Sequence, residues 1–268
     1  MVRIAVCSLY INGWYRYIVK YGKKTLENYC LKHGYDFIYE TENTKNGVYD
    51  GTREPTWFKI KLIEKILLSG KYDYVVWIDA DGHIMNDEIT LEHYINKHLD
   101  KSNIHILAST EWNNPGLCAS TLFLKNSPFV LDLLKDIWDN PSEFDKNFHE
   151  QASLIDLHKR NVKNCREHIL ILPQNEFLAF WYAYQPKKTF IFYAARCAHD
   201  RPGFIFTMDS HCPIKLDEET DDEFKIRKQR LDDPDICAQV IQHYKNGGMR
   251  LNPSRRCETY EPTLTFEF

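Results

Sequence analysis

A short, uninterrupted apolar run that leads directly into two carboxylates constrains this chain more than any other stretch. Residues 75–78 read Val-Val-Trp-Ile and are followed by Asp79-Ala80-Asp81-Gly82. A run of this length, rich in β-branched and aromatic residues, is typical of a strand that is buried on both faces, as in a parallel sheet. The sequence therefore predicts a central strand of an α/β sheet with an acidic pair at its carboxyl end.

The acidic pair is a candidate active-site edge. Open α/β sheets bind their ligands beyond the carboxyl ends of the strands. Alternation along an extended chain would send Asp79 and Asp81 to one side and Ala80 to the other. Two neighbouring carboxylates favour a hard divalent cation, Mn²⁺ or Mg²⁺, which is usually shared with substrate phosphates. Acidic pairs also occur in solvated turns, so it is the buried strand in front that favours a site.

The segments before this strand predict a right-handed βαβ unit. We expect a strand over residues 3–10, a helix over 15–33 that ends at Gly34, and a strand over 35–40. If the first strand runs parallel to residues 75–78, Ser8 and Tyr10 lie at the same sheet edge as Asp79. A polar loop over 41–54 and a helix over 56–69 complete this half.

The second half continues the alternation of helices and strands. We expect helices at 89–99, 128–138 and 147–160, strands at 104–109, 117–125, 169–173 and 189–193, and a loop at 194–203. Charged and more apolar helices at 217–231 and 235–244 precede a tail. The predicted fold is a Rossmann-like α/β domain over residues 1–215, with a mixed, mostly parallel sheet between helices. Residues 216–268 would form a helical extension packed on it.

Composition restricts the possible partners and the compartment. A formal net charge of −4 over 268 residues argues against a non-specific nucleic-acid binder. No apolar run approaches the ~20 residues that span a bilayer, and the first ten residues are too short an apolar segment for a signal peptide. The eight cysteines show no CxxC spacing, which favours reduced thiols, although Cys197 and Cys212 could pair in an oxidising compartment. These features predict a soluble cytoplasmic protein.

Two enzyme classes use a strand that ends in Asp-x-Asp. Haloacid-dehalogenase-type phosphatases resemble residues 78–82, with the first Asp as nucleophile and the second as general acid, but they carry this motif on their first strand and have Thr where this chain has His83. GT-A glycosyltransferases place a nucleotide-binding βαβ half first, then the Asp-x-Asp motif, then an acceptor-binding half. The order of elements here favours the second class.

Six short segments, in order, resemble glycosyltransferase family 34, the galactosyl-, mannosyl- and xylosyltransferases. They are Trp57-Phe58-Lys59, Trp77-Ile78-Asp79-Ala80-Asp81-Gly82, Leu122-Phe123-Leu124-Lys125-Asn126, the 133–138 helix, Glu150-Gln151-Ala152-Ser153 and the 175–181 segment. Two departures stand out. Cys118-Ala119-Ser120-Thr121 replaces the family's Asn-Thr-Gly, and Tyr193 falls where the family's metal-binding His is expected.

The resemblance implies a retaining transfer from a UDP-sugar donor to the hydroxyl of a glycan acceptor. Asp79 and Asp81 would hold the Mn²⁺, and His199 would substitute for the missing His. Gln151 would lie beneath the anomeric carbon, and Glu150 would hydrogen-bond the donor sugar.

The remaining donor contacts follow from charge and position. Lys59, Arg196 and Arg201 would contact the diphosphate, and Ser8 and Tyr10 the nucleotide base. Family members usually carry a Golgi membrane anchor, and the chain shown has none. Two explanations stay open: a soluble, cytoplasmic enzyme of the kind that a virus or a microbe would encode, or an anchor that lies outside the chain shown. A non-catalytic sugar-binding relative is the third hypothesis, against which the intact Asp79/Asp81 pair argues.

Overall fold

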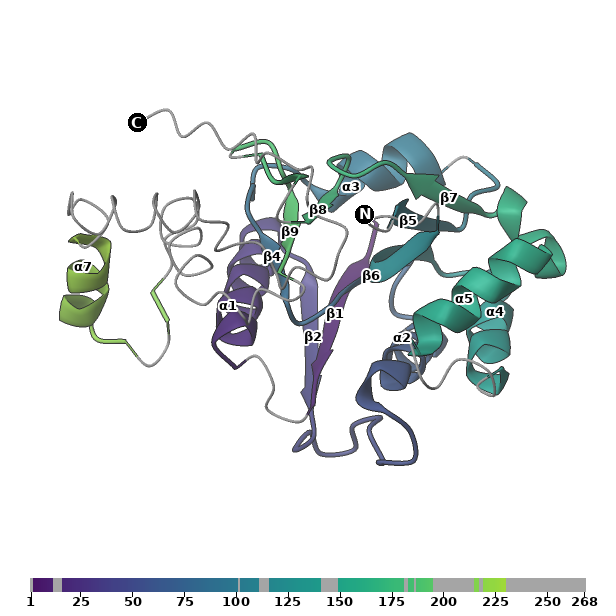
Figure 1. Cartoon of the computed structure of the whole chain (residues 1–268), viewed down its shortest axis with the longest axis horizontal. Helices are drawn as coiled ribbons and strands as arrows, with labels where there is room; N and C mark the ends of the chain where they lie inside the picture. Colours follow the sequence, from purple (N-terminus) through teal and green to yellow (C-terminus); the bar gives the residue numbers. More distant parts are fainter. Residues whose placement is uncertain are drawn as a thin grey trace, which may run out of the picture.

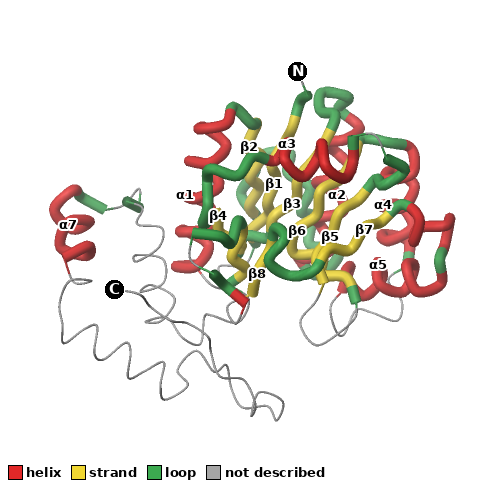
Figure 2. Tube along the Cα trace, turned by 90° about the horizontal axis from the view of Figure 1, so that it is seen from above, coloured by secondary structure: helices red, strands yellow, loops and turns green. Residues whose placement is uncertain are grey.

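A mixed six-stranded sheet forms the centre of the protein. The computed structural model describes residues 2–11, 16–100, 102–110, 116–140, 149–180, 183–185, 187–194, 215–216 and 219–229. The sheet has the order β2-β1-β3-β6-β5-β7 (Figure 2). Its strands are β1 (Ile4–Tyr10), β2 (Asp36–Thr41), β3 (Tyr74–Ile78), β5 (Ile106–Thr110), β6 (Leu117–Lys125) and β7 (Ile169–Leu172).

The pairing of these strands matches the expected α/β class. β1 runs parallel to β2 and to β3, and β5 runs parallel to β7, while β6 is antiparallel to both of its neighbours. All five residues of β3 are buried, which confirms the central strand that the apolar run predicted. The parallel pairing of β1 with β3 also confirms that residues 8–10 and Asp79 lie at one edge of the sheet.

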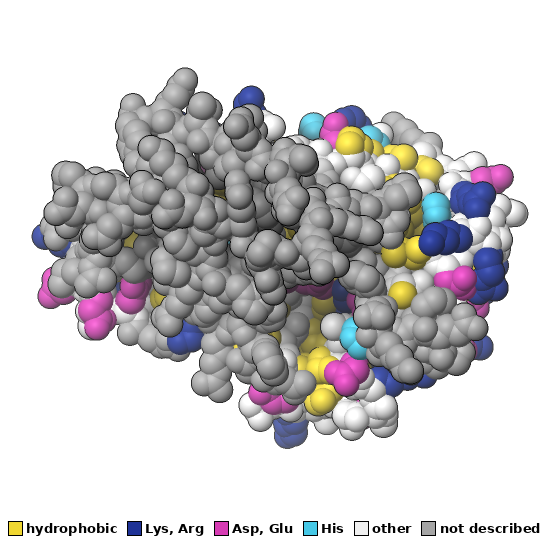
Figure 3. Space-filling model, viewed as in Figure 1, with side chains coloured by type: hydrophobic (Ala, Val, Ile, Leu, Met, Phe, Trp, Pro, Cys, Tyr) yellow, Lys and Arg dark blue, Asp and Glu magenta, His cyan; other side chains and the backbone are white. Residues whose placement is uncertain are grey.

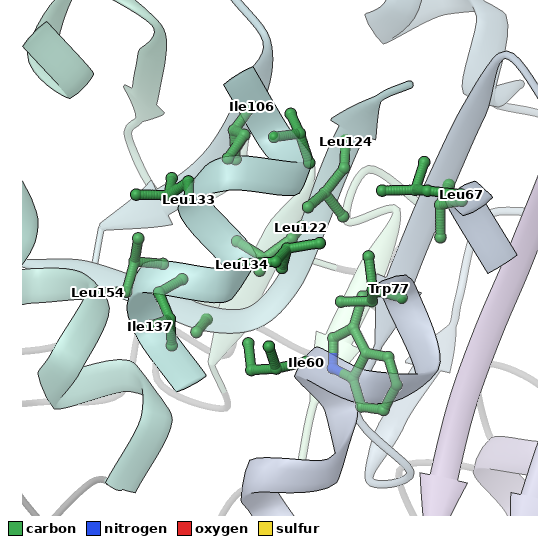
Figure 4. Close-up of a cluster of buried hydrophobic side chains, with 14 of the residues drawn as sticks. Ile60, Leu67, Trp77, Ile106, Leu122, Leu124, Leu133, Leu134, Ile137 and Leu154 are labelled. Atoms are coloured by element: carbon green, nitrogen blue, oxygen red, sulfur yellow. The ribbon is translucent and has the colours of Figure 1, made fainter. Parts of the chain in front are cut away.

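Helices cover both faces of the sheet (Figure 1). On one face lie α2 (Phe58–Leu68), α4 (Pro128–Asp139) and α5 (His149–Arg160), whose apolar side chains pack on Val75 and Trp77. Figure 4 shows part of this cluster, with Ile60 of α2, Leu133 of α4 and Leu154 of α5 turned toward the sheet. On the other face, α1 (Arg16–His33), α3 (Leu91–Tyr94) and the π-helical turn Ile95–Leu99 pack on the alternate side chains of β3. The period-2 alternation of β3 therefore supplies both cores.

A second, three-stranded sheet adjoins the end of β3. It has the order β4-β9-β8 and consists of β4 (Gly82–Ile84), β8 (Leu178–Phe180) and β9 (Ile191–Tyr193). Sequence analysis predicted β9 as part of a longer strand but missed β4 and β8, because three residues are too few to show a periodicity. The antiparallel β4–β9 pair brings Tyr193 opposite Gly82, beside the acidic pair.

The structure corrects the expectation that strand alternation directs the two carboxylates to one side. β3 ends at Ile78, and residues 79–82 form a turn in which Gly82 N donates to Asp79 O at 2.8 Å. The turn, and not strand alternation, therefore places the two carboxylates, because the chain must reverse toward β4. We call residues 79–82 the acidic turn.

The remaining elements follow the expected order. A 3₁₀ turn, Pro55–Trp57, precedes α2, a second one, Val162–Glu167, follows α5, and α7 (Asp221–Gln229) lies in the C-terminal part. Residues 195–214 and 230–268 lie outside the described residues, so the loop at 194–203, apart from its first residue, the helix at 235–244 and the packing of the extension stay predictions, as does a bond between Cys197 and Cys212. The thiols of Cys7, Cys30, Cys118 and Cys165 are buried and form no disulfide bond with one another.

The described helices include none that is both long and apolar enough to cross a membrane. On the face drawn in Figure 3, acidic and basic side chains of the described residues are interspersed rather than separated by sign.

Polar contacts attach α1 to β4. The ring of His83 is fully buried, and its Nε2 lies 3.0 Å from the carbonyl oxygen of Ile18. Thr25 Oγ1 donates to Gly22 O at 2.8 Å and accepts from Ile84 N at 3.1 Å. Burial lowers the pKa of His83 to about 4, so this ring is neutral in the folded protein at pH 7.

The neutral His83 predicts an acid-sensitive step in stability. Below its ordinary pKa of 6.5 the unfolded chain takes up a proton that the folded chain refuses until about pH 4. The free energy of unfolding should therefore fall by about 2–3 kcal/mol between pH 6.5 and pH 4 on account of this group. The free energy of unfolding, measured with urea at several pH values in that range, should depend less steeply on pH in His83→Gln than in wild type. His93→Gln, at an exposed position, should keep the wild-type dependence on pH. An equal dependence on pH in wild type and His83→Gln would contradict the assignment.

Candidate active site

A cavity of about 240 Å³ lies at the carboxyl ends of β1 and β3. Its polar end is lined by Lys59 of α2, by Asp79 and Asp81 of the acidic turn, and by Tyr193 of β9. Residues 9–11 at the end of β1, Val19 of α1 and Pro55-Thr56 line the rest. The cavity is therefore built from the βαβ unit and the second sheet together, at the edge where α/β sheets bind ligands.

The backbone of the acidic turn is held from two sides. Asp79 N donates to Ser120 O of β6 at 2.8 Å, and Ala194 N, which follows β9, donates to Asp81 O at 2.9 Å. Backbone hydrogen bonds of this kind fix where the Cα atoms of both aspartates lie. The two carboxylates consequently face the cavity from a rigid support.

Asp79 is anchored through one of its two carboxylate oxygens. Oδ1 accepts from Lys59 Nζ at 2.9 Å and from Trp77 Nε1 at 2.6 Å. Oδ2 has a longer contact, 3.4 Å, with the hydroxyl of Tyr193. Because Oδ1 already accepts two strong donors, Oδ2 is the oxygen that remains available to a ligand in the cavity.

Lys59 is the buried cation of the site. Its side chain is only 5% exposed, and Nζ lies 2.9 Å from Asp79 Oδ1, 2.8 Å from Glu150 Oε1 and 3.1 Å from Ala119 O. Burial alone would lower the pKa of this ammonium, but the carboxylates of Asp79 and Glu150 outweigh burial and leave the pKa raised. Three acceptors saturate its three N–H groups. Contact between Lys59 and a diphosphate, as predicted, would require it to leave one of them.

Asp81 has a different electrostatic environment. Burial, and next the charge of Asp79, raise the pKa of its carboxyl to about 7. Two carboxylates on one turn resist being ionised together unless a cation joins them. Lys59 is the counter-ion of Asp79. Asp81 is therefore the carboxylate whose charge is less well compensated.

The predicted catalytic side chains of α5 lie behind Lys59. Glu150 is buried, with Oε1 on Lys59, while its Oε2 has no hydrogen-bond partner in the described part of the chain. Gln151 Oε1 accepts from Ala119 N at 2.8 Å. Neither residue is among the described residues that line the cavity.

The other predicted site residues are distributed unevenly. Tyr10 lines the cavity, whereas Ser8 is fully buried beneath it and its Oγ has no hydrogen-bond partner among the described residues. Arg196, His199 and Arg201 lie outside the described residues, so their roles stay predictions. Within the described ranges no group of three or more His, Cys, Asp or Glu side chains forms a metal cluster.

Sequence reasoning missed two contributors to the site. Trp77 precedes Asp79 by two residues, the spacing that puts side chains on one side of an extended chain, and its indole N–H bonds to that carboxylate. Tyr193 was noted only as a departure from the family's His, yet it lines the cavity and contacts Asp79. The long sequence separation between Tyr193 and Asp79 hides that contact.

The raised pKa of Asp81 predicts that its charge destabilises the metal-free fold. The penalty is fully expressed above about pH 7 and disappears below the ordinary pKa of 3.8, because the carboxyl is then protonated in both states. Asp81→Asn should therefore raise the free energy of unfolding by up to about 4 kcal/mol at pH 8 and by less than about 1 kcal/mol at pH 4. Urea unfolding in EDTA measures this, with the exposed Asp87→Asn as control. A destabilised Asp81→Asn at pH 8 would contradict the assignment.

Removal of the buried cation should be costly. Lys59→Met would leave the carboxylates of Asp79 and Glu150 without their shared counter-ion, and the free energy of unfolding should fall by about 3 kcal/mol. Lys61→Met, two residues along α2 and paired with Glu64 at a side-chain exposure of 33%, should change it by less than about 1 kcal/mol. Chemical denaturation of both variants measures the difference, and equal effects would show that Lys59 is not the structural cation.

Comparison with known proteins agrees with this architecture. An uncharacterised α-1,2-galactosyltransferase of Schizosaccharomyces pombe is 30% identical over 106 residues, which are 38% of this chain and 26% of that protein. The chain thus matches about a quarter of the length of this curated relative. Among solved structures, a glycosyltransferase involved in the glycosylation of the major capsid of PBCV-1 superposes with a TM-score of 0.58 at 16% identity, over 71% of this chain and 93% of that one. This likeness shows a shared fold.

The family assignment rests on the extent of the match. The model of the galactosyl transferase GMA12/MNN10 family matches residues 16–199. That range contains α1, the acidic turn, Lys59, the first turn of α5 and Tyr193. The resemblance noted from the sequence is confirmed, and the chain belongs to the galactosyl transferase GMA12/MNN10 family.

Proposed function

We propose that this protein transfers a sugar from a UDP-sugar to a hydroxyl group of a glycan acceptor, with Mn²⁺ or Mg²⁺ bound at Asp79 and Asp81. The observation that carries the proposal is the acidic turn, which presents both carboxylates to one cavity at the carboxyl ends of β1 and β3. Membership of a glycosyltransferase family supports sugar transfer over the phosphatase hypothesis. The intact acidic pair argues against a non-catalytic sugar-binding relative.

The residues of the acidic turn fit a hard divalent cation. Asp79 Oδ2 and the Asp81 carboxylate are oxygen donors, which Mg²⁺ and Mn²⁺ prefer, and these cations commonly take their other ligands from phosphates and water. Because its pKa is raised to about 7, the Asp81 carboxyl is partly protonated near pH 7. A bound cation would take the place of that proton. A cation at this position would supply positive charge opposite the departing diphosphate.

Lys59 and Trp77 would keep the site in order before the donor arrives. Their hydrogen bonds hold Asp79 Oδ1, so Oδ2 keeps a fixed direction toward the cavity. Groups that are already oriented need no reorganisation when charge develops, which is the main source of electrostatic catalysis. The end of β1 with Tyr10, and Val19 of α1, would accommodate the nucleotide at the less polar end of the cavity.

Retention of the anomeric configuration is the part of the proposal that involves α5. The acceptor hydroxyl would attack the face from which UDP leaves, and Gln151 would stabilise the positive charge that develops at the anomeric carbon. The side-chain oxygen Oε1 of Gln151 accepts a hydrogen bond from Ala119 N. The proposal therefore includes a rotation of this side chain toward the cavity. Glu150 Oε1 stays on Lys59 in this scheme and orients it, and Glu150 Oε2 is the oxygen for the predicted hydrogen bond with the donor sugar.

The first test is calorimetric titration of UDP into the protein with Mn²⁺, and again with EDTA. We expect binding in Mn²⁺ that EDTA abolishes, because the cation joins the diphosphate to the two aspartates. Asp81→Asn should weaken binding by at least tenfold. Asp87→Asn, which removes an exposed carboxylate outside the cavity, should bind like wild type. Absence of UDP binding in every condition would contradict the proposal.

Turnover would then identify the donor. UDP-galactose is the first donor to assay, since the family's description and the name of the fission-yeast relative both refer to galactosyl transfer. UDP-xylose and UDP-glucose are the comparison donors. The anomeric configuration of the product, read by NMR, distinguishes retention from inversion.

A further inference from the structure

Gly22 of α1 lies directly against the backbone of the acidic turn. A Cβ atom at this position would be 2.5 Å from the carbonyl oxygen of Ala80 and 3.0 Å from that of Gly82. Backbone atoms cannot rotate away as the end of a long side chain can. Any residue other than glycine would therefore have to move either α1 or the acidic turn.

The contact is one of three neighbouring contacts between α1 and residues 80–84. Residues 18, 22 and 25 have the spacing that puts them on one side of a helix. Ile18 O contacts the His83 ring and Thr25 Oγ1 accepts from Ile84 N, so Gly22 lies between two polar attachments to β4. Figure 1 shows α1 beside β4. The distance between α1 and residues 80–84 is consequently set at three adjacent points.

The acidic turn has no freedom to retreat from a side chain at position 22. Its far side is bonded to Ser120 O and to Ala194 N. A displaced turn would break one of these bonds, and it would also move Asp79 away from Trp77 and Lys59. The same helix contributes Val19 to the cavity wall, so a displaced helix would change the width of the cavity instead.

We propose that Gly22 is a positioning residue: the absence of a side chain there lets α1 pack on the Ala80 carbonyl, and this packing sets the direction of Asp79 and Asp81. For the cation and the diphosphate, the inference rests on the proposed function. For the placement of Asp79 it does not, because that placement can be measured without any ligand.

The test compares Gly22→Ala with two controls. At an unobstructed helix position, replacing glycine by alanine raises stability. At position 22 we expect the opposite, because the added Cβ would clash with the carbonyl of Ala80. Leu99→Ala removes a buried side chain near Lys125, at the end of β3 remote from the acidic turn. Asn28→Ala changes an exposed position of α1. Leu99→Ala reports loss of stability alone, and Asn28→Ala reports a change in α1 alone.

Two readouts are needed. The first is the affinity for UDP with Mn²⁺, measured well below the melting temperature, which should fall at least tenfold in Gly22→Ala and by less than twofold in both controls. The second is the ¹H–¹⁵N resonance of the Trp77 indole in metal-free protein, assigned with Trp77→Phe. Because this N–H donates to Asp79 Oδ1, it should shift in Gly22→Ala and stay in place in the controls.

Each outcome decides the inference. Wild-type affinity and an unshifted Trp77 resonance in Gly22→Ala would overturn it. If Gly22→Ala does not fold, Thr25→Val serves, since it removes the neighbouring hydroxyl attachment without adding bulk; an unchanged affinity and resonance there would overturn it equally. If wild-type protein fails to bind UDP with Mn²⁺, the proposed function fails, and the Trp77 resonance still decides whether Gly22 positions Asp79.

Discussion

The ammonium group of Lys59 is the interaction on which the rest of the site depends. It joins the acidic turn, the first turn of α5 and the backbone of β6 at a point that is nearly closed to solvent. A buried charge is tolerated only when it is paired and its hydrogen bonds are satisfied. Because Lys59 meets both conditions through Asp79, Glu150 and Ala119, the packing of α2 against the sheet and the direction of Asp79 are fixed together.

This arrangement divides the two aspartates by role. Asp79 has its counter-ion and two donors on one oxygen, and therefore acts as the ordered member of the pair. Asp81 lies nearby with a raised pKa, so its ionised form carries an electrostatic cost in this fold. A site that is electrostatically incomplete in the metal-free protein is a common feature of functional centres, where binding relieves a cost that the fold maintains.

The small sheet β4-β9-β8 gives the cavity its other wall. β4 continues from the acidic turn, and β9 brings Tyr193 to the open oxygen of Asp79. The hydrogen bonds between α1 and β4 then connect the βαβ unit to this second sheet. The cavity thus lies where two sheets and the helices α1 and α2 meet, so its shape depends on contacts between elements more than on any one of them.

The sequence by itself determined the features that are local. The apolar run of β3, the βαβ order and the acidic pair are all contained in short segments whose periodicity and composition are sufficient to identify them. The fold class and the position of Asp79 and Asp81 at the sheet edge followed from these, and the family followed from the resemblance of six ordered segments. Only the tertiary structure decided that Lys59 pairs with Glu150, that Tyr193 reaches Asp79 and that Gly22 packs on Ala80. Each of these contacts joins residues distant in the chain, 114 apart for Tyr193 and Asp79, and no local pattern records which distant groups the packing of helices on a sheet will bring together.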